Sequence, residues 1–325
     1  MAGRDLKALL AAYRDRDDLS FRRAAQAIIE EEEAKRHTAL AKDLRRLLAS
    51  GSGLHVPSET IATPDAPRNR ETDAPLAEIV KPIRGLGSLV LSPQLGDILA
   101  EITEEVHRWP QLDAASIPRR RSLLLYGPPG CGKTSIAEAI ATELSRSLVI
   151  VKTEVIMSSY LGETASNISK IFEFASSGPY VLLFDEFDSI GKSREDSDDH
   201  GELRRVVNAV LQLVDRYQGP SLIIAATNHE KALDSALWRR FAEVLEVPLP
   251  NTEARKTVLL RVLMGRTDGH LDIDNAVAEL GGLPHSAVER AGFDALRLAL
   301  LSDRSVVTAA DLHEATQRTL KRRWA

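Results

Sequence analysis

The fold of this chain is indicated by one stretch, Leu123-Leu124-Leu125-Tyr126-Gly127-Pro128-Pro129-Gly130-Cys131-Gly132-Lys133-Thr134. Its first four residues form a short apolar run of the kind found in buried strands. The next eight fit the G-x-x-x-x-G-K-[ST] pattern, in which backbone N–H groups and the start of a helix surround phosphate. Glycine is needed in such a loop where a Cβ would collide with phosphate or where φ is positive. The stretch therefore predicts a strand, a phosphate-binding loop and a helix over residues 133–144.

Individual residues of the loop have separate expected roles. Lys133 is expected to reach the β- and γ-phosphates of a nucleotide, and Thr134 to ligate Mg²⁺. Cys131 occupies a variable position, and we interpret it as a small filler rather than a redox switch. ATP and Mg²⁺ are the expected cofactors. The expected nucleotide-binding residues are Gly127, Pro128, Pro129, Gly130, Cys131, Gly132, Lys133, Thr134 and Ser135.

The sequence around the loop alternates between strand and helix patterns. Further apolar runs predict strands at residues 148–151, 180–184, 222–226 and 244–247. Continuous apolar runs suit strands that are buried on both faces, so we expect an α/β fold with a doubly wound parallel sheet. After residue 250 the strand patterns stop, and residues 251–325 predict an all-α domain. Within it, Ser286-x-x-Glu289 and Thr308-x-x-Asp311 resemble helix capping boxes, the second with Asp in place of Glu.

The first 84 residues predict a different organisation. Residues 1–50 contain no proline, and their apolar residues at helical spacing predict two or three helices that form a docking or assembly module. Residues 51–84 contain five prolines and few large apolar residues, which predicts a flexible linker. The expected domains are therefore 1–50, 51–84, 85–250 and 251–325.

Composition limits the class of function. The 325 residues are 43% hydrophobic, which is enough for a sizeable core, and the net charge of −5 argues against bulk electrostatic binding to nucleic acid. The single cysteine allows no internal disulfide and favours a reducing compartment. No apolar run reaches the roughly 18 residues of a membrane span, and the N-terminus lacks the apolar stretch of a secretory signal. We therefore expect a cytoplasmic protein with no membrane association.

Two more strand ends carry the polar residues that ATP hydrolysis needs. Asp185 and Glu186 follow the apolar run 180–184, and Asn228 follows the run 222–226. Asp185 can orient the shell of the metal ion, and Glu186 can polarise the attacking water. The Asn228 amide could hold that water between Glu186 and the γ-phosphate. We expect Glu186 and Asn228 to be catalytic, with Thr134 and Asp185 at the metal.

In this order and spacing, the motifs resemble those of the AAA family of AAA+ ATPases over roughly residues 85–325. The resemblance implies an α/β domain followed by a helical lid, with ATP bound between them. Residues 233–241 resemble the segment that carries the arginine fingers of the family, which reach the γ-phosphate held by a neighbouring subunit. Guanidinium suits that task because it stays charged and presents a planar fork to phosphate. Arg240 is the first candidate and Arg239 the second, and the resemblance implies a homo-oligomer, expected to be a hexamer.

Residues 158–164 resemble the first pore loop of the family, in which an aromatic, an aliphatic and a glycine residue grip an extended polypeptide. The three residues here are Tyr160, Leu161 and Gly162. Residues 198–205 fall where a second pore loop would lie. The chain departs from many AAA+ branches at residues 281–288, which lack a phosphate-sensing arginine. His285 in this segment could approach the adenine, or it could serve as a cap or surface residue.

Three functions remain open on this evidence. The leading hypothesis is an oligomeric Mg-ATP hydrolysing ATPase that remodels, unfolds or translocates a protein. The second is a nucleotide-dependent switch that controls a partner effector. Residues 158–208 and 227–248 are similar to stand-alone bacterial AAA ATPases, some encoded beside a subtilisin-like serine protease in systems that exclude phage or plasmids, so such a protease and a role in antiviral defence are expectations. The third is a DNA-acting AAA+ protein, suggested by basic clusters at 119–121 and 321–323, although the net charge of −5 argues against nucleic acid as a partner.

Overall fold

The computed structural model describes residues 25, 27–29, 65–157, 161–187, 210–229, 238–267, 269 and 271–324. The chain divides into two compact units, Met1–Asp65 and Ala66–Ala325. In the first unit, residues 25 and 27–29 are helical and Ile29 is buried, while most of the predicted N-terminal helices lie outside the described residues. The second unit carries the predicted nucleotide site.

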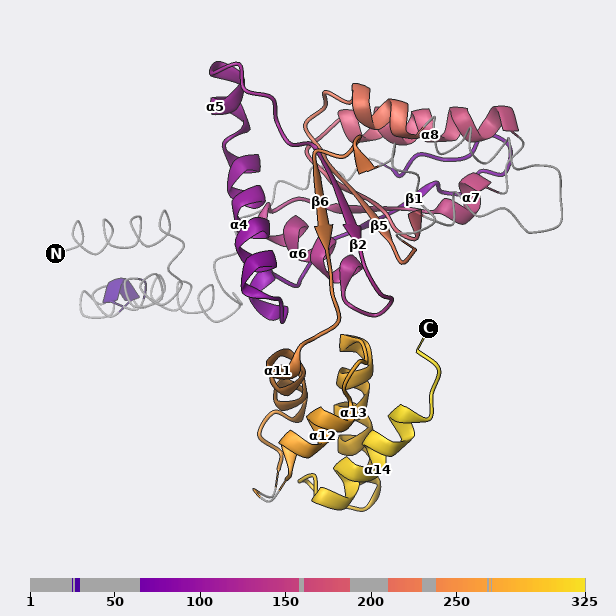
Figure 1. Cartoon of the computed structure of the whole chain (residues 1–325). Coiled ribbons are helices and arrows are strands. Elements are labelled where there is room, and N and C mark those ends of the chain that lie inside the picture. The colour runs from indigo at the N-terminus through magenta and orange to yellow at the C-terminus, as the bar shows by residue number, and fades with distance from the viewer. Residues whose placement is uncertain are drawn as a thin grey trace. The chain divides into compact units, whose positions relative to one another are not determined.

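A six-stranded sheet forms the centre of the second unit (Figure 1). Its order is β1-β3-β4-β5-β2-β6, and all neighbours are parallel except β1 and β3. The strands are β1 (Ala77–Val80), β2 (Ser122–Tyr126), β3 (Leu148–Val151), β4 (Val181–Phe184), β5 (Leu222–Thr227) and β6 (Glu243–Glu246). The mostly parallel α/β fold and the strands predicted from apolar runs are thus confirmed.

Both faces of the sheet are covered, as the apolar runs require. Along β2, Leu124 packs into one hydrophobic cluster while Leu123 and Leu125 pack into the other, because successive side chains of a strand point to opposite faces. The Leu124 face is covered by α7 (Thr153–Met157) and α8 (Leu161–Ser176). The opposite face is covered by α4 (Pro93–His107), α5 (Trp109–Ala114) and α6 (Lys133–Glu143).

The start of the sheet corrects one expectation. Residues 51–84 were predicted to be a linker, but residues 77–80 form the edge strand β1, with Ala77 paired to Val151. Leu76 is fully buried, and its carbonyl accepts a hydrogen bond from the Lys152 N–H at 2.9 Å. The strand is only four residues long and lies between two prolines, so its apolar content is too low to stand out from the surrounding sequence.

The chain leaves β6 and forms four helices around a third hydrophobic cluster (Figure 1). They are α11 (Thr252–Leu263), α12 (Ile273–Glu279), α13 (His285–Leu301) and α14 (Ala309–Leu320), which we call the lid helices. The capping box of Thr308 and Asp311 is confirmed at the start of α14. The box expected at Ser286 is wrong, because Pro284 occupies the cap position of α13 and no side chain caps this helix. Among the described residues, no helix is both long and apolar enough to cross a membrane.

Candidate nucleotide site

The phosphate loop lies between the end of β2 and the start of α6, as predicted. Gly127 has φ +141°, and a Cβ there would collide with the Val247 carbonyl of the segment after β6. Gly130 has φ +73°, and a Cβ there would collide with the Ser286 hydroxyl of the lid helix α13. Both positions therefore need glycine for space as well as for backbone angle.

The Lys133 side chain folds back onto the phosphate loop and binds its backbone carbonyls. Its side chain is 6% exposed, and its Nζ donates to the carbonyls of Gly127 and Pro128 at 2.8 Å each. These are neutral acceptors, so the ammonium keeps its positive field at the centre of the loop. That arrangement suits binding of phosphate oxygens at the start of α6, where the helix dipole also favours anions.

Thr134, in the first turn of α6, and Asp185, directly after β4, are joined by a hydrogen bond. The Thr134 Oγ1 donates to the Asp185 Oδ2 at 2.6 Å, and the Asp185 Oδ1 accepts from the backbone N–H of Glu186 at 2.9 Å. Hydroxyl and carboxylate oxygens are the donors that Mg²⁺ prefers, usually with phosphate oxygens and water completing the shell. Within the described ranges, no group of three or more His, Cys, Asp or Glu could hold a metal alone. The residues therefore fit a magnesium ion that depends on the nucleotide for further ligands.

Glu186 follows β4 with φ +48°, a left-handed backbone that is unusual for a non-glycine residue. Such a conformation costs on the order of 1–3 kcal/mol and is concentrated at functional sites. Parallel strands end at the same edge of the sheet, and the order β4-β5-β2 places Asn228, after β5, between the acidic strand and the phosphate loop. The topology thus gathers residues that are about 100 positions apart in sequence at one edge.

One cavity of about 610 Å³ brings these residues together. It is lined by part of the phosphate loop, by Asp185, Glu186 and Asn228, and by residues of the lid helices. The loop residues that line it are Pro129, Gly130, Cys131, Gly132, Lys133, Thr134 and Ser135, whereas Gly127 and Pro128 contribute through their contacts with Lys133. Burial raises the pKa of the Cys131 thiol, so it stays protonated, in agreement with its interpretation as a filler.

The lid helices contact the phosphate loop directly, which the sequence did not predict. The backbone N–H of Ser286 donates to the Gly130 carbonyl at 3.1 Å, and the His285 Nε2 lies 3.1 Å from the Val90 carbonyl. A carbonyl accepts only, so this His285 nitrogen carries the proton. Burial lowers the pKa of His285, which keeps the ring neutral. His285 therefore lines the cavity half-buried and joins the start of α13 to the segment that precedes α4.

The expected arginine fingers lie apart from the cavity of their own chain. Neither Arg239 nor Arg240 lines it, and the Arg240 Nη1 forms an ion pair with Asp215 Oδ2 at 2.8 Å. Tyr160 and residues 198–205 lie outside the described residues, and Leu161 and Gly162 are described only as the backbone start of α8. The finger and pore-loop roles therefore remain predictions.

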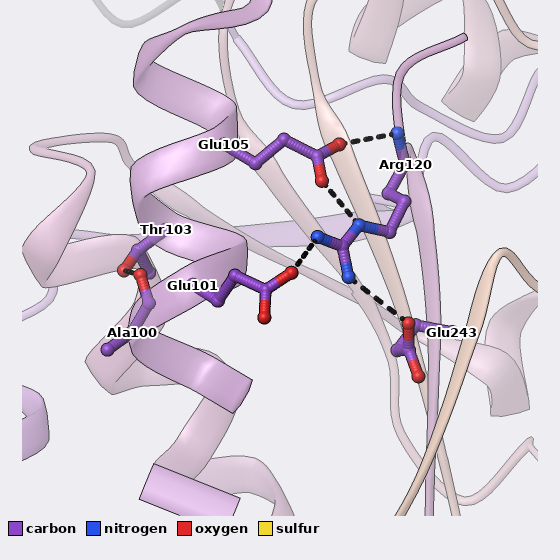
Figure 2. A network of polar contacts seen from close by, with 6 residues as sticks. All are labelled: Ala100, Glu101, Thr103, Glu105, Arg120 and Glu243. Carbon is purple, nitrogen blue, oxygen red and sulfur yellow. Dashed lines mark hydrogen bonds and ion pairs between the residues drawn. The ribbon is translucent and has the colours of Figure 1, made fainter. Parts of the chain in front are cut away.

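Arg120, the middle residue of the basic cluster 119–121, is neutralised by carboxylates. Figure 2 shows the Arg120 guanidinium between Glu101 and Glu105 of α4 and Glu243 of β6. The backbone N–H of Arg120 also donates to Glu105 at 2.9 Å. These contacts join α4 to the edge of the sheet, and they raise the pKa of Arg120. Arg120 is thus a structural residue, and this weakens the case for a nucleic-acid surface.

Comparisons with known proteins agree with this geometry. Residues 123–249 match the family described as AAA, ATPase family associated with various cellular activities. The uncharacterized AAA family ATPase y4kL of Sinorhizobium fredii is 38% identical over 99% of this chain and 96% of its own length. The proteasome-activating nucleotidase of Sulfurisphaera tokodaii is 33% identical over 70% of this chain and 60% of its own length. The crystal structure of the FIGL-1 AAA domain matches 75% of this chain and 85% of that chain with a TM-score of 0.61 at 23% identity, which shows likeness of fold.

Proposed function

The chain belongs to the AAA family and is an ATPase, and from this premise we propose that it works as an oligomer that remodels, unfolds or translocates a protein. The observation that carries the proposal is the single cavity lined by Lys133, Thr134, Asp185, Glu186 and Asn228. It combines phosphate-binding, metal-binding and water-activating groups at one edge of the sheet.

Each of these groups has one task in the proposed hydrolysis. Lys133 shifts its hydrogen bonds from the loop carbonyls to the phosphate oxygens. Thr134 and Asp185 hold Mg²⁺, which supplies charge neutralisation on the phosphates when it is bound. Glu186 accepts the proton of the attacking water, and the Asn228 amide orients that water toward the γ-phosphate.

We propose that Arg240 acts on the nucleotide of a neighbouring subunit. In support, it does not line the cavity of its own chain, and its partner Asp215 is 41% exposed, so the ion pair is weak enough to exchange. An arginine finger contributes on the order of 10³–10⁵ in rate. Arg239 is the second candidate, and a homo-oligomer, most simply a hexamer, follows from either choice.

Mixing two inactive variants tests this arrangement. Arg240→Ala chains lack the finger but keep Glu186, and Glu186→Gln chains lack the base but keep Arg240. If the finger acts between subunits, mixed rings contain some complete sites, so ATP turnover rises above that of either variant alone. An arginine that acts within its own chain would give no recovery on mixing, and an Arg240→Ala variant with full turnover would remove the role altogether.

The protein substrate is proposed from the names of relatives and from the aromatic loop. The relatives include a proteasome-activating nucleotidase, whose name links it to the proteasome. We propose that Tyr160, with Leu161 and Gly162, contacts an extended polypeptide. Tyr160→Ala is expected to keep basal ATP turnover and lose protein remodelling, measured as unfolding of a fluorescent protein carrying a disordered tail. Unchanged unfolding by this variant would exclude the pore-loop role.

A second candidate function is a nucleotide-dependent switch for a partner effector. The chain spans 96% of y4kL but only 60% of the nucleotidase, so its full-length similarity is to a protein whose name carries no protein-handling role. The effector we propose is a protease such as a subtilisin-like enzyme, in a cytoplasmic defence system against phage or plasmids. Co-purification with the ATP-bound Glu186→Gln variant separates the candidates, because a switch retains one defined partner whereas a remodelling enzyme retains many unfolded chains.

A further inference from the structure

A second cluster of cationic side chains lies at the other end of β2, away from the nucleotide cavity. Trp109, the first residue of α5, is 3% exposed. Three guanidinium groups lie over its indole ring, with distances to the ring centroid of 5.1 Å for Arg119, 5.3 Å for Arg146 and 5.9 Å for Arg121. We call these four residues the Trp109 cluster.

The cluster is held by the same two elements that flank the phosphate loop. Arg121 directly precedes β2, and Arg146 follows the end of α6. The five residues of β2 span about 17 Å, so the cluster and the phosphate loop are separate sites. Arg120 lies between Arg119 and Arg121 in sequence but turns to the three carboxylates of Figure 2.

The Trp109 cluster has a surplus of positive charge. Arg119 forms an ion pair with Asp113, and Arg146 donates to the carbonyl of Pro220 at 3.0 Å. In the part of the chain that the structure describes, neither Arg121 nor Arg146 forms an ion pair. Three cations and one carboxylate leave a net charge of about +2 around the Trp109 ring, and like charges repel.

The cluster also contains buried donors without acceptors. The Trp109 Nε1 and the Arg121 Nε are buried, and neither has a hydrogen-bond partner among the described residues. Both groups can only donate. The ring face of Trp109 interacts with the guanidinium groups, but its N–H lies at the ring edge and is not satisfied by that contact. Buried polar groups are nearly always satisfied by protein, water or an ion, so these two need an acceptor.

The burial of Arg121 and Arg146 also indicates that the cluster lacks a negative charge. It lowers the pKa of Arg146, and together with the nearby Arg119 it lowers the pKa of Arg121. A bound negative charge would reverse both effects. The cluster reaches the surface through Arg119, whose side chain is 18% exposed. No ion pair fixes the Arg121 guanidinium, so this long side chain can shift to admit a ligand.

We propose that the Trp109 cluster is an anion-binding site for an oxyanion, that is, a phosphate or carboxylate group of a ligand or partner. An oxyanion offers several acceptor lone pairs to donors that only donate, and it balances the surplus charge. Guanidinium groups suit it because their planar forks match the geometry of carboxylate and phosphate.

Thermal unfolding of the full chain tests the proposal without an activity assay. The experiment uses the Lys133→Ala variant, because this substitution removes the phosphate-binding lysine from the nucleotide cavity. Unfolding is followed in sodium chloride, sodium phosphate and sodium glutarate at one pH and one ionic strength. A ligand that binds only the folded state raises Tm, and we expect a rise of about 2–4 °C at anion concentrations well above Kd.

Added substitutions locate the effect. Arg121→Gln is expected to abolish the rise, and Trp109→Phe, which keeps the ring but removes the N–H, is expected to reduce it. Arg322→Gln, an exposed arginine of the other basic cluster, is the matched control and should keep the full rise. A rise in phosphate alone assigns a phosphate group, and an equal rise in glutarate assigns a carboxylate group. No rise in either anion, or an equal rise with Arg121→Gln, would overturn the site.

The fluorescence of Trp109 gives a second measurement in case a variant unfolds. In a chain with Trp238→Phe and Trp324→Phe, the remaining indole is expected to change its emission as phosphate or glutarate is added. An emission spectrum that does not respond to either anion contradicts the proposal.

Discussion

The two ends of the β2–α6 unit hold positive charge in different ways. At the phosphate loop, one buried lysine lies among backbone carbonyls, and backbone geometry supplies the remaining donors. At the opposite end, three arginine guanidiniums lie over one tryptophan ring, and one of them, Arg119, pairs with a carboxylate. The first end is organised by the main chain and the second by side chains. A sequence motif can therefore encode the first end, whereas the second depends on tertiary packing.

The largest expected effect is at the phosphate-loop end. Glu186→Gln is expected to lower ATP turnover by about 10²–10⁴, because the amide cannot accept the proton of the attacking water. Binding of a fluorescent ATP analogue should persist, since Lys133 and Thr134 are unchanged. Glu289→Gln is the matched control, because Glu289 lines the same cavity from α13 and has no proposed catalytic role. Equal turnover in the two variants would contradict the assignment of the base.

Substitution of Arg120, which lies between Arg119 and Arg121 in the sequence, is expected to have the next largest effect. Arg120→Ala leaves Glu101, Glu105 and Glu243 without their shared cation, so we expect a loss of about 2–3 kcal/mol in the free energy of unfolding, measured with urea. Arg108→Ala breaks one exposed pair with Glu104 and should cost under about 0.5 kcal/mol. If the two variants unfold at the same urea concentration, the network does not join α4 to the sheet.

A smaller effect tests how far the backbone conformation of the phosphate loop determines ATP binding. Gly130→Ala is expected to weaken ATP binding by about tenfold, because the residue has φ +73° and its new Cβ meets the Ser286 hydroxyl. Adding Ser286→Ala removes that hydroxyl and should recover part of the affinity, while the backbone strain remains. Calorimetric titration with a non-hydrolysable ATP analogue measures both. A double variant as weak as Gly130→Ala would show that contact with the lid does not contribute.

The smallest expected effect concerns a pair remote from both ends. Arg304 donates to Asp311 and lowers the pKa of that carboxyl well below its usual value, with burial opposing the shift. Because the folded pKa lies below the unfolded value of about 3.9, the stabilisation is complete above that value and is lost as the pH falls below it. Asp311→Asn should therefore cost about 1–2 kcal/mol at pH 7 and progressively less below pH 4. Urea unfolding across this range checks it, and a difference independent of pH would contradict it.

The sequence predicted the loop end well because its signals are local. The apolar runs, the glycine spacing and the polar residue after each strand all lie within a few residues of the feature that they encode, and the structure places them around one cavity. The edge strand β1 was missed because four residues between prolines carry too little apolar pattern. Ser286 was taken for a cap because the pattern ignores Pro284, which fixes the start of α13.

Side-chain clusters were beyond the reach of sequence reasoning for a physical reason. The carboxylates around Arg120 come from 15, 19 and 123 residues away, and nothing in the run 119–121 shows which side of the chain each arginine takes. The contact between His285 and Val90 spans 195 residues. Such pairs follow only from the order of strands and the packing of helices.

The hydrogen bond from the Ser286 N–H of α13 to the Gly130 carbonyl couples the orientation of the lid helices to the phosphate loop, and so to nucleotide affinity. Any tilt of α13 must lengthen this hydrogen bond or move the phosphate loop with it. By linkage, a protein that holds the lid helices in one orientation changes the ATP dissociation constant by the same factor by which ATP changes the grip on that protein. The lid helices and the phosphate loop therefore respond to each other through this main-chain contact.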